Sequence, residues 1–199
     1  MKEVKKSSPG NFVFKLMLPG DVFHSNKQPS FVIKNKNSSS IEERWYLFGK
    51  LGRLSNQEPT IKSYDNYGTL NVEKWYYDNK LHRDNNLPAY IEYYRSCNIS
   101  SQLWMICGKL GRTDIGSVHI MYRENKMIKY EAYQLNTHGN ETHTVNYNKN
   151  GNKKVEWWMK DNKIHRDDLP AYKQYWPDGR IKKDIWCQNA IETDSVMYD

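Results

Sequence analysis

Two copies of a His-Arg-Asp sequence are the residues of this chain most suggestive of chemistry. They occupy residues 82–84 and 165–167. The catalytic loop of protein kinases carries the same three residues, but a kinase also needs a glycine-rich loop, a strand lysine and an Asp-Phe-Gly sequence, which this chain lacks. Because both copies hold the same place in a repeated sequence, we interpret them as structural. Each arginine is predicted to pair with a carboxylate; the alternative is that Asp84 or Asp167 closes a turn on the backbone.

The other histidines and the cysteines predict no catalytic or metal site. His138 and His143 lie in the sequence HGNETH, whose spacing permits a metal ion, but no third ligand is near and we interpret the segment as a polar loop. Cys97, Cys107 and Cys187 are odd in number and form no CxxC pair, so neither a zinc site nor a disulfide framework is indicated. We therefore expect a reducing compartment, no cofactor and no enzymatic activity.

The elements that position these residues belong to a tandem repeat. The sequence WYYDNKLHRDNNLP begins at Trp75, and a near copy, WMKDNKIHRDDLP, begins 83 residues later. Two weaker copies share the pattern of Trp, three residues, Gly or Asn, Lys, Leu or Ile, Gly or His, and Arg. The anchors are spaced by roughly 25–30 residues, which predicts about six units. The residues assigned a structural role in the repeat are Trp45, Trp75, Trp104, Trp158, Arg53, Arg83, Arg112, Arg166, Pro88 and Pro170.

Each repeat has the pattern of a β-hairpin followed by a further strand. Residues 72–77 are rich in β-branched and aromatic side chains, and residues 78–79 have the Asn that a type I′ turn favours at its second position. Residues 80–82 form the return strand, and residues 83–88 a connector that ends in proline. We predict an all-β fold: an elongated, twisted antiparallel meander of about six hairpin repeats, with the tryptophans stacked as a core stripe.

The domain division follows from where the repeat begins. Residues 1–40 do not fit it and are predicted to form an N-terminal cap or strand-exchange element, while residues 41–199 form the repeat domain. The sequence contains no apolar stretch long enough for a transmembrane helix, and its first apolar run is too short for a secretory signal. We therefore expect an intracellular protein that is not secreted.

The net charge of +7 favours anionic partners in general. The densest basic pairs after the N-terminus are Lys153-Lys154 and Lys182-Lys183, which are the candidate anion-binding residues. Exposed aromatic rings beside lysine and arginine can stack nucleic-acid bases, although the fixed repeat positions of Trp and Tyr favour a core role. A nucleic acid or an anionic lipid surface is therefore the alternative partner.

The repeat resembles the "WYKNGKLHRxDGPA" repeats of proteins from large DNA viruses of protists, which are relatives of MORN repeats. The resemblance is strongest over residues 72–94 and 155–176, and Leu87 and Leu169 depart from it where the family has glycine. It implies β-hairpin repeats in a viral protein, in host cytoplasm or virion. The relation to MORN repeats further implies a role in scaffolding, self-association or contact with a membrane surface. We therefore expect a non-enzymatic repeat scaffold for protein–protein interaction or a structural role.

One geometric prediction separates the two functions. Arginine occupies the same position in all four well-preserved units, whereas a solvated cation would not need a fixed position. We predict that each guanidinium lies against the sheet, with the arginine stem packed on an aromatic ring and the head paired with a carboxylate or with carbonyls of an adjacent strand. Glu73 and Glu156 are the expected carboxylates. Arginines pointing into solvent along one edge would instead favour an anionic partner.

Overall fold

The computed structural model describes residues 2–8, 11–19, 22–25, 27–35, 37–55, 57–136 and 139–199. These residues form strands, turns and bends and no helix, so the predicted all-β antiparallel meander is confirmed. No helix suited to crossing a membrane occurs in the described ranges. The chain divides into two units, Met1–Lys109 and Leu110–Asp199.

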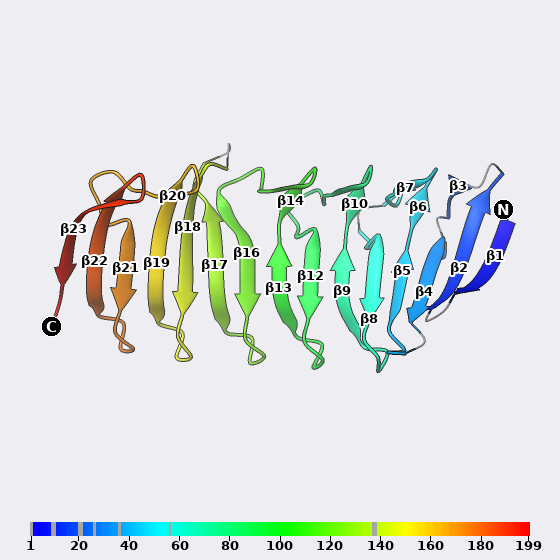
Figure 1. The fold of residues 1–199 in the computed structure, drawn as a ribbon, viewed down its shortest axis with the longest axis horizontal. Coiled ribbons are helices and arrows are strands. Elements are labelled where there is room, and N and C mark those ends of the chain that lie inside the picture. Colours follow the sequence, from blue (N-terminus) through cyan, green and yellow to red (C-terminus); the bar gives the residue numbers. More distant parts are fainter. Residues whose placement is uncertain are drawn as a thin grey trace. The chain divides into compact units, whose positions relative to one another are not determined.

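The first unit contains a meander of eight antiparallel strands, each paired with the next (Figure 1). They are β1 (Lys2–Ser8), β2 (Asn11–Leu18), β4 (Phe31–Asn35), β5 (Ile41–Arg44), β8 (Ile61–Tyr64), β9 (Leu70–Lys74), β12 (Tyr90–Tyr93) and β13 (Ile99–Leu103). Short strands lie beside them: β3 (Val22–Phe23), β6 (Tyr46–Leu47), β7 (Lys50–Leu51), β10 (Tyr76–Tyr77), β11 (Lys80–Leu81) and β14 (Met105–Ile106). The strand β15 spans Lys109–Leu110.

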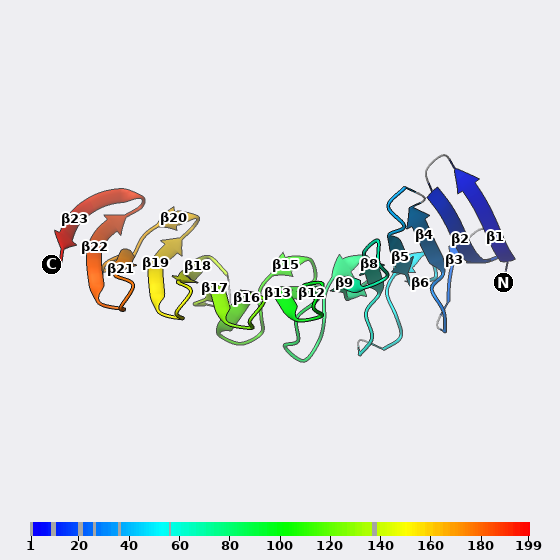
Figure 2. The same ribbon diagram turned by 90° about the horizontal axis from the view of Figure 1, so that it is seen from below.

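The second unit contains a meander of seven antiparallel strands, again paired in chain order (Figure 1 and Figure 2). They are β16 (Gly116–Tyr122), β17 (Ile128–Gln134), β18 (Glu141–Tyr147), β19 (Lys153–Lys160), β21 (Tyr172–Tyr175), β22 (Ile181–Gln188) and β23 (Ile191–Met197). The short strand β20 (Lys163–Ile164) pairs with the end of β19.

The hairpin turns have the predicted type I′ backbone. Their two central residues both have positive φ: 48° and 64° at Asp78 and Asn79, and 50° and 62° at Asp161 and Asn162. In the first unit the hairpins β6–β7 and β10–β11 lie at the same end of the main strands (Figure 1). The predicted strand over residues 72–77 is interrupted at Trp75, where β9 gives way to β10.

The backbone of the tryptophan bonds to the segment that follows the connector proline. The Trp75 amide donates to the Ala89 carbonyl at 2.8 Å, and the Trp158 amide donates to the Ala171 carbonyl at 2.9 Å. Ala89 and Ala171 are fully buried, so only a small residue fits after the connector proline. Trp75 is itself buried, as expected for a core residue.

The predicted core stripe is only partly buried. Trp45, Trp75 and Trp104 are buried, whereas Trp158 is half-buried. The connector prolines Pro88 and Pro170 are buried as well. The tryptophan rings therefore differ in how well the neighbouring strands cover them, although their motif is shared.

The N-terminal segment contains a degenerate repeat that the sequence pattern does not reveal. Met17 is buried at the position of tryptophan, His24 corresponds to the histidine of the motif, and the fully buried Ser30 corresponds to Ala89. The predicted boundary after residue 40 lies within the first unit, where β4 pairs with β5. A cap or strand-exchange role for residues 1–40 stays a prediction.

Candidate functional site

The arginines of the repeat lie on the tryptophan rings. The guanidinium carbon is 3.8 Å from the ring centroid for Arg83 on Trp75 and 3.9 Å for Arg166 on Trp158. Arg53 lies on the Trp45 ring in the same way, at 4.5 Å. An aromatic contact was predicted for the arginine stem, whereas in these three arginines the guanidinium itself lies over the ring.

The arginine heads bind backbone carbonyls of their own connectors. A terminal nitrogen of Arg83 donates to the Pro88 carbonyl at 3.3 Å, and a terminal nitrogen of Arg166 donates to the Pro170 carbonyl at 3.4 Å. Arg53 donates equally to Pro59, and Arg112 to Ser117. Three of these arginines, Arg53, Arg83 and Arg166, therefore each fasten a connector across a tryptophan.

The predicted partners Glu73 and Glu156 are wrong, although Arg53 and Arg112 do pair with other carboxylates, those of Glu58 and Asp114. Neither Glu73 with Arg83 nor Glu156 with Arg166 forms an ion pair in the described structure. Burial lowers the pKa of Arg83, and the nearby Glu73 charge opposes that shift without a hydrogen bond. The glutamates are instead occupied by tyrosine hydroxyls from later strands.

A carboxylate and a tyrosine form a recurring pair across the repeats. The carboxylate stands two residues before the aromatic anchor of its unit, and the tyrosine lies 14 to 21 residues later. The hydroxyl donates to the carboxylate at 2.7 Å in Tyr93–Glu73 and 2.8 Å in Tyr147–Glu131. The other pairs are Tyr64–Glu43, Tyr175–Glu156 and Tyr198–Asp184.

The tyrosines of these pairs stay protonated because burial and the adjacent carboxylate both oppose ionisation. The pKa of Tyr64 rises to about 12 for this reason, and the pKa values of Tyr93, Tyr147 and Tyr175 are also raised. Such hydroxyls serve as permanent hydrogen-bond donors rather than as acids or bases. Sequence reasoning missed these pairs, although the Glu-x-aromatic spacing was a visible signal.

Glu156 has the densest set of partners. It is buried and accepts hydrogen bonds from His143 and Lys153, both at 2.8 Å, and from Tyr175. Burial alone would raise the pKa of this carboxyl, but the three donors outweigh it and lower the pKa to about 2. Glu156 is therefore a fixed anion that cannot act as a general acid near neutral pH.

The histidine of the His-Arg-Asp motif joins each repeat to the next hairpin. His82 accepts at Nδ1 from the Cys107 amide at 3.4 Å, and His165 accepts from the Asn189 amide at 3.3 Å. His24 accepts from the Phe48 amide at the same position of its unit. The other ring nitrogen faces an aspartate two residues on, at 3.0 Å for His82 and 3.3 Å for His165. Both nitrogens of the motif histidine are thus engaged.

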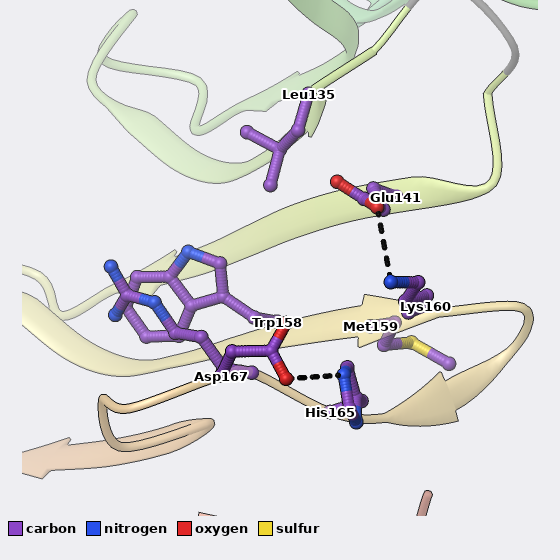
Figure 3. Close-up of a pocket in the computed structure, with 8 residues that line it drawn as sticks. Leu135, Glu141, Trp158, Met159, Lys160, His165 and Asp167 are labelled. Carbon is purple, nitrogen blue, oxygen red and sulfur yellow. Dashed lines mark ion pairs between the residues drawn. The ribbon is translucent and has the colours of Figure 1, made fainter. Parts of the chain in front are cut away.

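A pocket of about 400 Å³ lies beside the second copy of this motif (Figure 3). Two contacts join side chains of its wall: Glu141 with Lys160 at 3.7 Å, and Asp167 with His165 at 3.3 Å. Arg166 also lines the pocket and donates to the Pro170 carbonyl, and the rest of the wall includes Leu135, Trp158 and Met159. The polar side chains that line the pocket are thus used within the fold.

Of the two histidines considered as metal ligands, His143 lies on β18 rather than in the predicted polar loop. His138 lies outside the described residues. His143 lies between the Tyr133 and Trp158 rings, at 5.5 and 4.2 Å between ring centroids, while bonding to Glu156. In the described ranges no group of three or more His, Cys, Asp or Glu side chains could hold a metal ion.

The candidate anion-binding lysines have different surroundings. Lys153 is paired with Glu156, and Lys182 lies over the Trp176 ring at 4.2 Å. Lys183 is half-buried on β22. Lys154 is exposed and lines an open groove of the second unit.

Comparison with protein-family models finds no match to this sequence, and comparison with curated proteins finds none either.

Proposed function

We propose that this protein is a non-enzymatic repeat scaffold that binds another protein along its hairpins and connectors. The recurring residues that suggested chemistry are used within the fold, since arginine lies on tryptophan, histidine accepts from the next hairpin and glutamate accepts from tyrosine. The resemblance of the motif to MORN-like viral repeats supports a scaffold role and extends the proposal to a viral protein.

The observation that carries the proposal is a row of exposed apolar side chains in two neighbouring repeats of the first unit. Leu54 and Leu87 are exposed in its connectors, and Phe48 and Tyr77 in its hairpins. The two connectors are two main strands apart, which is about 10 Å. In the second unit Ile115 and Leu169 are exposed, and Leu169 holds the same place before the connector proline as Leu87.

Exposed apolar residues in such a row favour a protein partner. Single exposed apolar residues are ordinary on a protein surface, but a group of them in neighbouring repeats marks an interaction site. Repeat proteins generally bind through extended surfaces that successive units build together. The partner can also be a second copy of the chain. Self-association of this kind would support a viral structural role.

The proposal is tested by site-specific photo-cross-linking from two matched tyrosines. Tyr77 in the hairpin and Tyr67 in the turn between β8 and β9 are 68% and 69% exposed. Each is replaced in turn by a photoreactive phenylalanine analogue in the cells that make the protein. A discrete cross-linked protein is expected from position 77 and not from position 67.

A second variant shows whether the cross-link reflects the apolar row. Leu54→Ser combined with Leu87→Ser is expected to abolish the cross-link from position 77 without lowering the melting temperature, because both side chains are exposed. Equal cross-linking from positions 67 and 77, or capture that survives the double variant, would refute the proposal.

A further inference from the structure

An open groove of about 800 Å³ lies on the second unit across β17, β18, β19 and β21. Four cations line it, namely Arg123, Lys129, Lys149 and Lys154, and no lining residue is acidic. Like charges that gather without a counter-charge repel one another, so such a cluster raises the affinity for an anion.

The three lysines of this groove are unpaired in the described structure, whereas other lysines of the same unit are paired. Lys129, Lys149 and Lys154 are exposed and take part in none of the ion pairs of the described residues. By contrast, Lys153 is paired with Glu156 and Lys173 with Asp184. The separation of paired and unpaired lysines leaves the groove as a concentrated positive surface.

Arg123 is held in place at the edge of this surface. Its Nη2 donates to the Tyr147 carbonyl at 2.7 Å, while its buried Nε has no hydrogen-bond partner in the described structure. A buried guanidinium nitrogen without a partner is uncommon in a folded protein. The bond to Tyr147 orders this cation before any ligand arrives.

The floor of the groove carries a ring and two amides. The strand register places Asn146, Val155 and Gln174 directly beside one another across β18, β19 and β21. Tyr172 lies two residues before Gln174 on β21 and is therefore on the same face. The groove thus offers hydrogen-bonding amides and an aromatic ring between its cations.

We propose that this groove binds a short stretch of single-stranded nucleic acid. The lysines would contact phosphates, the Tyr172 ring would stack on a base, and the Asn146 and Gln174 amides would bond base edges. Cations that follow a backbone and aromatic rings that stack bases are the two components of single-strand binding. A duplex keeps its base faces stacked inside, so the ring would have no base to contact.

Fluorescence anisotropy of a labelled thymidine or uridine oligonucleotide with the full chain tests the cations. Lys129→Gln, Lys149→Gln and Lys154→Gln are combined in one variant. The control combines Lys80→Gln, Lys109→Gln and Lys163→Gln, which removes the same charge from exposed hairpin positions. We expect about tenfold or greater weakening at low salt in the groove variant alone, and a salt slope smaller by about two, at about 0.7 per phosphate contact.

Tyr172→Leu tests whether the ligand is a nucleic acid rather than any polyanion. Stacking of one base predicts about fivefold to a hundredfold weaker oligonucleotide binding, with binding to a sulfated polysaccharide unchanged. Phosphatidylserine vesicles serve as the membrane probe and are expected to bind more weakly than the oligonucleotide at equal salt.

Several results would overturn the proposal. Equal weakening in the groove and control variants would show that net charge alone drives binding. Binding that survives Tyr172→Leu, or vesicle binding that is tighter and equally sensitive to the groove lysines, would assign the surface to another anion. Absence of oligonucleotide binding at low salt would remove it altogether.

Discussion

The two best copies of the motif, residues 72–94 in the first unit and 155–176 in the second, share their internal contacts and differ in their surroundings. Arginine lies 3.8 Å from the tryptophan ring in one copy and 3.9 Å in the other, and histidine accepts from the next hairpin in both. Yet Trp75 is buried while Trp158 is half-buried.

The carboxylates of these copies show the same contrast. Among described residues, Glu73 accepts only the Tyr93 hydroxyl, whereas Glu156 accepts from His143, Lys153 and Tyr175. The motif therefore determines contacts within a repeat, and the neighbouring strands determine burial and electrostatics. Matched substitutions in both copies test this distinction.

The largest expected effect is on the tryptophans. Trp75→Ala should lower the free energy of unfolding by about 3–5 kcal/mol, as loss of a buried aromatic residue does. Trp158→Ala should cost less, because this residue is less completely buried. Urea unfolding followed by circular dichroism measures both, and equal losses would show that burial does not distinguish the copies.

The second effect is on the carboxylates and depends on pH. Glu156 has a pKa of about 2 in the folded state, below its ordinary value of 4.5, so folding favours the ionised form. The ionised Glu156 therefore adds on the order of 3 kcal/mol to the free energy of unfolding. This contribution is complete above pH 4.5 and is lost as the pH falls toward 2. The stability difference between wild type and Glu156→Gln should shrink over that range in urea titrations.

Glu73→Gln provides the matched comparison at neutral pH. Because this glutamate accepts one tyrosine hydroxyl rather than three donors, its loss should cost about 1 kcal/mol, less than that of Glu156→Gln. A larger loss at Glu73 than at Glu156 would mean that the number of donors does not set the contribution of the carboxylate.

The arginines should respond alike in the two copies. Arg83→Lys and Arg166→Lys should each cost about 1–3 kcal/mol, because lysine cannot both stack flat on tryptophan and reach the proline carbonyl. Arg95→Lys is the control, since Arg95 lies 3.8 Å from the Tyr67 ring but is exposed. If Arg95→Lys costs as much as Arg83→Lys, stacking alone rather than fastening of the connector accounts for the loss.

The smallest expected effect is on the motif histidines. His82→Ala and His165→Ala each remove one acceptor for a hairpin amide and should cost about 1 kcal/mol in thermal unfolding. Asparagine at either position should restore part of this loss by offering another acceptor. Unequal losses of stability from His82→Ala and His165→Ala would show that the motif does not determine the strength of this contact.

Local patterns in the sequence were sufficient for the strand class and the turns. The residues of a type I′ turn are neighbours in the chain, and their conformational preference acts whatever the surroundings, so the positive φ values at Asp78 and Asn79 could be expected. The register of Arg83 and Arg166 likewise indicated packing on an aromatic ring, because each arginine lies eight residues after its tryptophan in a closed hairpin.

The tertiary structure alone decided which distant side chains meet. Strand pairing and its register shifts bring Tyr93 to Glu73 and Tyr175 to Glu156, where local reasoning chose arginine. The same pairing gathers Lys129, Lys149 and Lys154 around one groove, and of the four lysines that the sequence singled out only Lys154 lies there. Sequence by itself determined the repeating unit, because its hairpin is stabilised by near neighbours. Side chains that meet between strands are 14 to 29 residues apart in the sequence, so their contacts depend on the register of the strands. A single bulge can change that register.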